Sequence, residues 1–279
     1  MSYRTILVHL DTSVRAHPRL ETALQLSKRF GAHVNGLFAV FEPDPRAFNI
    51  MAGTAVYYEQ HASTRAEQRG AIERLFHAEI KRAGVSGEWI ETQERANDAV
   101  PRFARCADLV VVSQDDPTDP ESYVGDHFPE TTILASGRPV LLIPYTGFFA
   151  SVGKHPMIAW DGSREASRAV HDALPFLQMA ERVSIVSVDT STGEARDDRI
   201  PCADIAACIA RHGIKTEVSS GGVTSDATVG ELLLSRTADL NADLVVMGGY
   251  GHARWQELVL GGATRTFLAS MSVPVLMSH

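Results

Sequence analysis

The stretch ADLVVV at residues 107–112 returns 135 residues later as ADLVVM at residues 242–247. A second pair of stretches, PVLL at 139–142 and PVLM at 274–277, has the same separation. A third pair, ILVHLDTS at 6–13 and MIAWDGS at 157–163, aligns Asp11 with Asp161 at a separation of 150 residues. Three matches in the same order indicate that the chain contains two copies of one structural unit.

The two separations differ because the first copy carries an insertion. We place this insertion within residues 41–63, a stretch that contains Pro43, Pro45 and Gly53 and shows little periodicity. The predicted domains are residues 1–147 and residues 154–279. Each has the usual size of a domain, roughly 100–200 residues.

Each copy alternates apolar runs with amphipathic segments. After the run at 157–160, Ala166, Ala169, Val170 and Ala173 have the spacing of one helix face. Runs such as 244–247 are apolar without alternation, which is typical of parallel strands covered by helices on both faces. The predicted strands are 5–10, 33–40, 88–92, 108–112 and 139–143, then 157–160, 183–188, 216–219, 244–247 and 273–277. The predicted helices are 17–30, 64–83, 97–106 and 128–136, then 166–177, 205–211, a segment around 229–233, and 264–271. The fold class is therefore α/β, with two tandem doubly wound parallel five-stranded sheets flanked by helices.

Composition and charge exclude several classes of protein. The chain has 44% hydrophobic and 22% charged residues, and its net charge of −8 is shared evenly between the two copies. An acidic balance argues against a broad nucleic-acid-binding surface. No apolar run reaches the ~18 residues of a membrane span, and the first residues lack the layout of a secretory signal. The three cysteines form no motif and suit a reducing compartment, so we expect a cytoplasmic protein. The histidines show no metal-binding spacing, so no transition metal is expected.

A glycine-rich loop follows the predicted strand 244–247. Gly248, Gly251 and Gly261 have the spacing G-x2-G-x9-G, and the last predicted helix is opened by Gly262, Ala263 and Thr264. Glycines let a backbone approach an anion, and the free N–H groups at a helix start carry partial positive charge. In open parallel sheets, ligands bind beyond the carboxyl ends of the strands where the strand order reverses. The loop fits a phosphate cradle; taken alone, its glycines fit tight turns at a sheet edge equally well. It matches neither the P-loop nor the dinucleotide fingerprint.

The loop and its surroundings resemble the universal stress protein family. The resemblance rests on the glycine spacing, on Asp161 after the first strand of the second copy, and on the closing VPVL at 273–276. It covers the whole chain, taken as two copies, and implies an adenine nucleotide alpha-hydrolase-like fold that binds ATP, with or without Mg, in the second copy. One departure is Gly262, where the family usually has Ser or Thr; Thr264 is the nearby hydroxyl.

The resemblance also implies roles for individual residues. Gly248, Gly251 and Gly261 match positions that surround the ribose and phosphates, and Asp161 matches one beside the adenine or ribose. Val188 and Met247 match positions that line the base. His252 has two interpretations, a phosphate or acid–base contact and an ordinary surface histidine.

The first copy has lost the cradle. The offset of 135 places Ser113 on Gly248, Asp116 on Gly251 and Asp126 on Gly261. Carboxylates close to a triphosphate repel it by about 1 kcal/mol per pair even at water-like screening. We therefore expect one ATP site per chain, in the second domain.

The leading hypothesis is a stress-response protein that binds ATP and acts as a regulator rather than a dedicated enzyme. One alternative is a slow ATP hydrolase in which His252 or a nearby carboxylate positions water. Another is an interaction module in which the insertion, with Phe48, Tyr57 and Tyr58, covers an apolar ligand or a partner. The resemblance further implies that the last strands of the two copies meet, so that one chain forms an internal pseudo-dimer; a homodimer of chains stays open.

Overall fold

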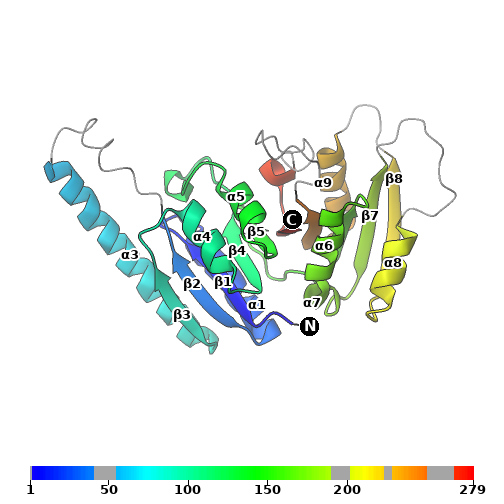
Figure 1. Ribbon diagram of the computed structural model, residues 1–279, viewed down its shortest axis with the longest axis horizontal. Helices are drawn as coiled ribbons and strands as arrows, with labels where there is room; N and C mark the ends of the chain where they lie inside the picture. Colours follow the sequence, from blue (N-terminus) through cyan, green and yellow to red (C-terminus); the bar gives the residue numbers. More distant parts are fainter. Residues whose placement is uncertain (1, 41–54, 190–201, 223–227, 250–266) are drawn as a thin grey trace. The chain divides into compact units, whose positions relative to one another are not determined.

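The computed structural model describes residues 2–40, 55–189, 202–222, 228–249 and 267–279. Contacts divide the chain into two compact units (Figure 1). The first unit is Tyr3–Thr132, and the second is Ile133–His279 together with the first two residues. The predicted domain limits, 1–147 and 154–279, differ from this division and remain a prediction.

The first unit contains a parallel four-stranded sheet in the order β3-β2-β1-β4. Its elements in chain order are β1 (Thr5–Leu10), α1 (Ala16–Phe30), β2 (His33–Phe38), α3 (Ala55–Ala83), β3 (Gly87–Glu91), α4 (Ala96–Ala104), β4 (Leu109–Ser113), the short 3-10 helix η1 (Pro120–Ser122) and the start of α5 (Phe128–Ala135). The chain places β2 and β3 on one side of β1 and β4 on the other. The strand order therefore reverses between β1 and β4.

The second unit repeats this order and adds two strands. Its elements are β5 (Val140–Ile143), β6 (Pro156–Trp160), α6 (Arg164–Asp172), α7 (Leu174–Leu177), β7 (Val183–Asp189), α8 (Ala203–Ala210), β8 (Thr216–Gly222), α9 (Val229–Asp239), β9 (Leu244–Gly248) and β10 (Val275–Ser278). The strand order is β5-β10-β9-β6-β7-β8. All neighbours are parallel except β5 and β10, which pair antiparallel with Met277 opposite Val140. The reversal point lies between β6 and β9.

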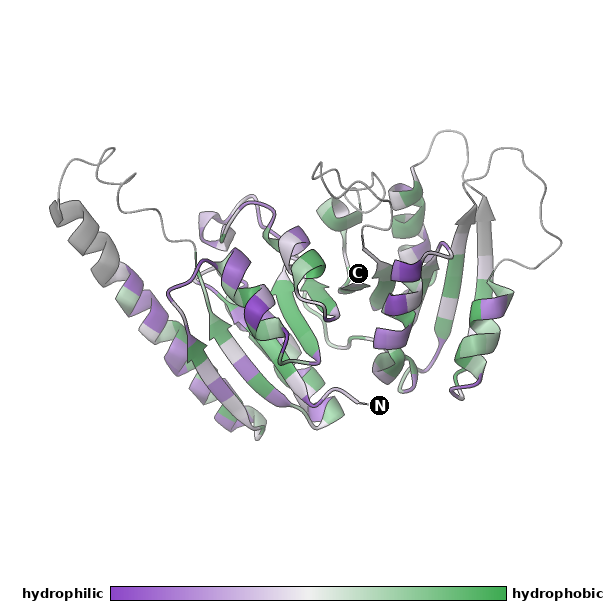
Figure 2. Ribbon diagram, viewed as in Figure 1, coloured by the Kyte–Doolittle hydropathy of each residue, from purple (hydrophilic) through white to green (hydrophobic). Residues whose placement is uncertain are grey.

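The repeated ADLVV stretches have the same structural task in both units. The Asp108 carboxylate accepts hydrogen bonds from the backbone N–H groups of Arg4 and Thr5 at 2.8 and 2.9 Å. Asp243 accepts bonds from the N–H groups of Lys154 and His155 at 2.9 and 2.8 Å. Each aspartate thus ties the start of one central strand to the start of its neighbour. The strands that follow the two aspartates, β4 and β9, are almost wholly buried, and Figure 2 shows hydrophobic central strands beside helices with hydrophilic stripes.

Two helices differ from the sequence prediction. The predicted helix 64–83 begins earlier, at Ala55, so α3 includes part of the predicted insertion. The remainder of the insertion, including Phe48, lies outside the described residues. The predicted helix 166–177 is two helices, α6 and α7, because Pro175 has no N–H group to donate to the preceding turn.

Candidate functional site

The carboxyl ends of three neighbouring parallel strands meet in the second unit. β6 lies between β7 and β9, with Ala159 opposite Met247 and Trp160 opposite Ser187. Asp161 follows β6 directly, and Gly248 ends β9. Because the strand order reverses between β6 and β9, this edge is where an open parallel sheet binds ligands.

Asp161 stands at this edge with its side chain exposed. Its Oδ1 accepts a hydrogen bond from the Ser163 backbone N–H at 2.9 Å. The Ser163 hydroxyl in turn accepts one from the Ala166 N–H at 3.1 Å and caps the start of α6. No further contact of Asp161 is seen within the described residues, so its carboxylate has capacity to accept hydrogen bonds from a ligand.

Gly248 sits where β9 meets the start of α6. A Cβ at this position would lie 2.5 Å from the Ala166 backbone nitrogen and 2.7 Å from the Glu165 carbonyl carbon. Because neither backbone atom can move aside cheaply, only glycine fits here while α6 keeps its place. Gly248 therefore has a packing role whatever the loop binds, and the Met247 side chain before it is buried at 6% exposure.

The other predicted site residues are only partly described. Val188 lies in β7, opposite Gly221 of β8, and its side chain is outside the described residues. Gly251, His252, Gly261, Gly262, Ala263 and Thr264 all lie outside the described residues. The structure thus brings Asp161, Met247 and Gly248 to one edge.

Glu165 is a buried carboxylate at this edge that the sequence reading did not single out. It is only 4% exposed, and it receives a hydrogen bond from the Arg164 guanidinium. Burial by itself would raise the pKa of Glu165, but the bond from Arg164 and the nearby backbone amide outweigh it and lower that pKa. The sequence signal that could have identified Glu165 is its position just after the Ser163 cap, because acidic residues favour the first turn of a helix.

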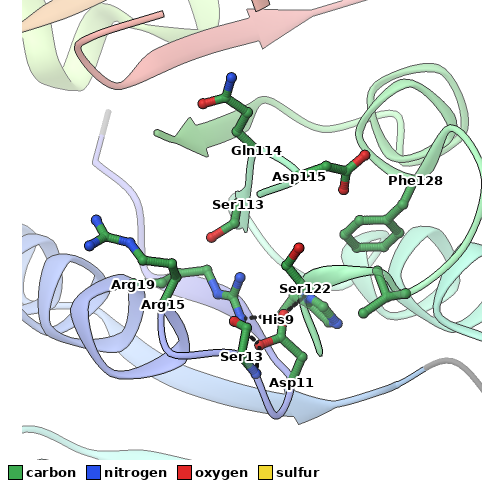
Figure 3. A pocket seen from close by; sticks show the side chains of 11 residues that line it. His9, Asp11, Ser13, Arg15, Arg19, Ser113, Gln114, Asp115, Ser122 and Phe128 are labelled. Atoms are coloured by element: carbon green, nitrogen blue, oxygen red, sulfur yellow. Dashed lines mark hydrogen bonds and ion pairs between the residues drawn. The ribbon is translucent and has the colours of Figure 1, made fainter. Parts of the chain in front are cut away.

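The corresponding edge of the first unit holds a pocket (Figure 3). Its cavity volume is about 10 Å³, which is room for about one water molecule. The lining residues come from the end of β1, the start of α1, the end of β4 and the segment that follows it: His9, Asp11, Ser13, Arg15, Arg19, Ser113, Gln114, Asp115, Ser122, Val124 and Phe128.

A buried ion pair forms the floor of this pocket. Asp11 and Arg19 are 2% and 1% exposed, and Arg19 Nη2 lies 2.8 Å from Asp11 Oδ2. The Ser13 hydroxyl and N–H both donate to Asp11 Oδ1, at 2.6 and 3.0 Å. Burial alone would raise the pKa of Asp11, but Arg19, His9 and Ser13 together lower it. Asp11 is therefore ionised and fully engaged by its own unit.

His9 adjoins this pair as a neutral ring. Its Nε2 lies 2.7 Å from the Ala39 carbonyl oxygen, which can only accept, so Nε2 carries the proton. Its Nδ1 lies 3.9 Å from Asp11 Oδ2, too far for a hydrogen bond. Burial, with Arg19 as the second cause, lowers the pKa of His9 to about 4. The ring packs against Phe128 with the centroids 4.8 Å apart.

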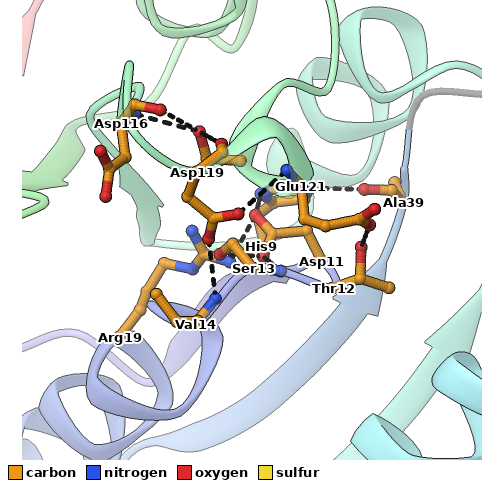
Figure 4. Close-up of polar contacts among 11 residues, drawn as sticks. His9, Asp11, Thr12, Ser13, Val14, Arg19, Ala39, Asp116, Asp119 and Glu121 are labelled. Carbon is orange, nitrogen blue, oxygen red and sulfur yellow. Dashed lines mark hydrogen bonds and ion pairs between the residues drawn. The ribbon is translucent and has the colours of Figure 1, made fainter.

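Most carboxylates of the acidic segment after β4 accept hydrogen bonds from the first unit itself (Figure 4). Asp119 Oδ2 accepts from the Val14 N–H at 3.0 Å, and Glu121 accepts from the Thr12 hydroxyl. Asp116 accepts from the N–H and hydroxyl of Thr118. The bonds of Asp119 and Glu121 tie the segment to the loop after β1, and those of Asp116 stay within the segment. The sequence reading treated these carboxylates only as repulsive charges.

Asp115 differs from its neighbours because no hydrogen bond of its carboxylate is seen within the described residues. Partial loss of solvation, followed by repulsion from Glu130, raises the pKa of Asp115 to about 6. At neutral pH it is therefore mostly ionised and contributes a negative charge to the pocket.

Sequence reasoning missed the His9, Asp11 and Arg19 cluster. The signal was present in the repeat alignment, where the offset of 150 places Ala159 and Ala169 in the second copy opposite His9 and Arg19. Large polar residues opposite alanines mark a site where the copies have diverged. Within the described part of the chain, no group of three or more potential ligand residues is arranged to hold a metal ion, and no helix is long and apolar enough to cross a membrane.

No family model and no curated protein matches the sequence. Among solved structures, the chain is similar to a universal stress protein from Archaeoglobus fulgidus, with a TM-score of 0.72 and 18% identity over 98% of this chain and 97% of that one. It is also similar to a functionally unknown protein from Pseudomonas aeruginosa, with a TM-score of 0.62 and 14% identity over 99% of this chain and 92% of that one. The chain therefore has the fold of universal stress proteins over its whole length, and the resemblance predicted from the sequence is confirmed at the level of the fold.

Proposed function

We propose that the second predicted domain binds an adenine nucleotide, ATP, and that the chain is a stress-response regulator rather than a dedicated enzyme. The observation that carries the proposal is the position of Gly248. It ends β9 at the reversal point of the sheet and is the first glycine of the G-x2-G-x9-G pattern. A glycine-rich loop that starts there is suited to present backbone N–H groups to phosphates.

The described residues fit such a ligand. The exposed Asp161 carboxylate would accept hydrogen bonds from the hydroxyl groups of the ribose or the amino group of the base. Met247 lies near the end of β9 and Val188 near the end of β7, on the two sides of β6, and they would form the apolar wall for the base. Gly251, His252 and the turn Gly261, Gly262, Ala263 and Thr264 would hold the phosphates, with or without Mg.

The proposal is tested by nucleotide content and by titration. Purified protein is extracted for bound nucleotide, and the emptied protein is titrated with ATP by calorimetry. We expect binding with a Kd in the micromolar range, which corresponds to about −8 kcal/mol. Gly251→Asp should abolish binding, because it places a carboxylate in the cradle and a side chain where the backbone must approach the phosphates.

A matched control lies in the first copy. Asp116→Gly restores a glycine at the position equivalent to Gly251, and it should leave both nucleotide content and affinity unchanged. If the wild type carries no adenine nucleotide and shows no titration with ATP, the proposal is wrong. If Asp116→Gly binds a second equivalent of ATP, the expectation of one site per chain is wrong.

We further propose that one chain forms an internal pseudo-dimer and works in the cytoplasm. The antiparallel pairing of β5 with β10 supports the pseudo-dimer, because these are the last strands of the two sequence copies. Size-exclusion chromatography with light scattering separates a single chain of 30.3 kDa from a homodimer.

A further inference from the structure

The strand β10 ends beside the start of the glycine-rich loop. β10 pairs with β9, with Ser278 opposite Gly248, so the next residues, His279 and Gly249, are neighbours. We propose that His279 is a positioning residue for nucleotide binding: it holds the backbone of Gly249 and so fixes where the loop leaves the sheet. This inference rests on the proposed function, because it concerns the loop that would hold the phosphates.

Both backbone polar groups of Gly249 are engaged by consecutive residues. Its N–H donates to the Ser278 carbonyl oxygen at 2.9 Å. Its own carbonyl oxygen lies 3.0 Å from His279 Nδ1, and since a carbonyl oxygen can only accept, Nδ1 carries the proton and donates it. The two bonds belong to the two planar peptide groups that flank the Gly249 Cα. Together they restrict both backbone dihedral angles of this glycine.

Gly249 needs such contacts because a glycine has no Cβ to limit its backbone. Packing supplies part of the restraint, since a Cβ on Gly249 would lie 3.0 Å from Ile133 Cγ2 and 3.3 Å from Met277 Cε. Apolar contacts of this kind are non-directional. A hydrogen bond depends on its angle, so the bond from His279 sets the direction of the Gly249 carbonyl group.

The start of α6 lies at the same edge. α6 packs against both β9 and β10, and Glu165 in its first turn is 4% exposed. Burial raises the pKa of Glu165, whereas Arg164, a backbone amide and His279 lower it. His279 therefore lies within electrostatic reach of this carboxylate. The ring, Gly249 and the start of α6 meet where the proposed nucleotide site begins.

The sequence repeat supplies an independent argument. The offset of 135 residues places Pro144 on His279 and Gln114 on Gly249. Proline has no side-chain hydrogen-bond donor, so the first copy has no group at this position that could make the same bond. The copy without the glycine pattern therefore also lacks the donor, as expected if the two features serve one function.

The test compares substitutions of His279 in the full chain by calorimetric titration with ATP. His279→Ala removes the donor, and His279→Asn keeps one, because the amide nitrogen of asparagine is attached to Cγ, as Nδ1 is in histidine. His171→Ala in α6 is the matched control, since His171 Nδ1 also lies 2.8 Å from a backbone carbonyl oxygen, that of Ser167. Amide hydrogen exchange of Gly249 without nucleotide reports on the contact directly.

We expect His279→Ala to weaken ATP binding roughly three- to tenfold, which corresponds to the loss of one hydrogen bond. Exchange of the Gly249 amide should become faster by a similar factor. His279→Asn should restore both to within about twofold of the wild type, and His171→Ala should change neither. A general loss of stability would lower the thermal midpoint without moving the Kd, and asparagine would not rescue it.

Unchanged ATP affinity in His279→Ala overturns the proposal, as does equal weakening by His279→Ala and His279→Asn or by His279→Ala and His171→Ala. Weakened ATP binding with unchanged exchange of the Gly249 amide also overturns it, because His279 would then act on the nucleotide and not through the loop. Each of these results leaves ATP binding by the wild type intact. A wild type that shows no titration with ATP instead overturns the proposed function and this inference together.

Discussion

The turns that follow β1 and β6 are built alike and serve different ends. In both, an aspartate accepts a hydrogen bond from the N–H group two residues later, at 3.0 Å for Asp11 and 2.9 Å for Asp161. Asp11 is then closed off by Arg19 and is 2% exposed, whereas Asp161 is exposed. Two alignment positions account for the difference, since His9 and Arg19 stand where the second copy has Ala159 and Ala169.

The comparison shows how one copy of a repeated unit keeps a strand-end aspartate and changes its use. In the first unit, the guanidinium of Arg19 in α1 forms an ion pair with the Asp11 carboxylate. In the second unit Ala169 offers no such partner, and the Asp161 carboxylate is exposed. The first unit therefore buries its strand-end carboxylate in an ion pair, and the second unit leaves the equivalent carboxylate exposed.

The largest effect is expected from removing the guanidinium. Arg19→Ala gives the first unit the residue of the second copy, but it leaves the Asp11 carboxylate buried without its ion-pair partner. Losing one member of a buried pair costs about 3–5 kcal/mol, so the free energy of unfolding should fall by that amount. Urea denaturation of the variant measures it.

A surface ion pair supplies the control for this variant. Arg168→Ala breaks the half-exposed pair with Asp172 in α6 and should cost less than about 1 kcal/mol. Equal losses of unfolding free energy for Arg19→Ala and Arg168→Ala would mean that burial does not raise the cost of breaking the Asp11–Arg19 pair.

His9 should make the stability of the first unit sensitive to acid. Its folded-state pKa of about 4 lies below the ordinary value of 6.5, so its contribution is present above pH 6.5 and is lost as the pH falls toward 4. Full loss amounts to about 3 kcal/mol. His9→Ala should unfold more easily at neutral pH, because the bond to Ala39 and the packing on Phe128 are lost, but its stability should decline less steeply between those pH values.

The measurement for His9 is urea denaturation at a series of pH values. His171→Ala serves as the control, since this exposed histidine in α6 should leave the slope unchanged. Parallel pH profiles for wild type and His9→Ala would contradict the buried, neutral ring.

A smaller effect is expected from exchanging the residues at the ends of β4 and β9. Gly248→Ser places a Cβ within 2.5 Å of the Ala166 nitrogen and should destabilise the second unit by about 1–3 kcal/mol, as overpacking does. The reverse change, Ser113→Gly, should cost about 1 kcal/mol or less, mainly through backbone entropy. Thermal unfolding of both variants checks the asymmetry, and similar losses would mean that α6 can shift to admit a side chain.

Much of the fold was predictable from the sequence because the evidence is local. The apolar runs at 5–10, 108–112 and 244–247 were predicted as strands, and they correspond to β1, β4 and β9. The repeat separations of 135 and 150 residues aligned the two copies. Helix limits were less predictable where tertiary contacts or proline decide them, as at Ala55 and at Pro175. Of the candidate site, the sequence located Asp161 and Gly248 at strand ends, which the parallel sheet brings to one edge.

The sequence by itself determined the α/β class and the loss of the glycine pattern from the first copy. Periodicity and residue type are properties of the chain, and they require no knowledge of what packs against what. Only the tertiary structure decided that His9, Asp11 and Arg19 meet. The pairing of β1 with β4 brings Ser113 to the same edge of the sheet. In the second unit, packing places Gly248 against the start of α6. Burial and pairing decide whether a charge is a liability or a binding element, and those are set by the packing of distant segments.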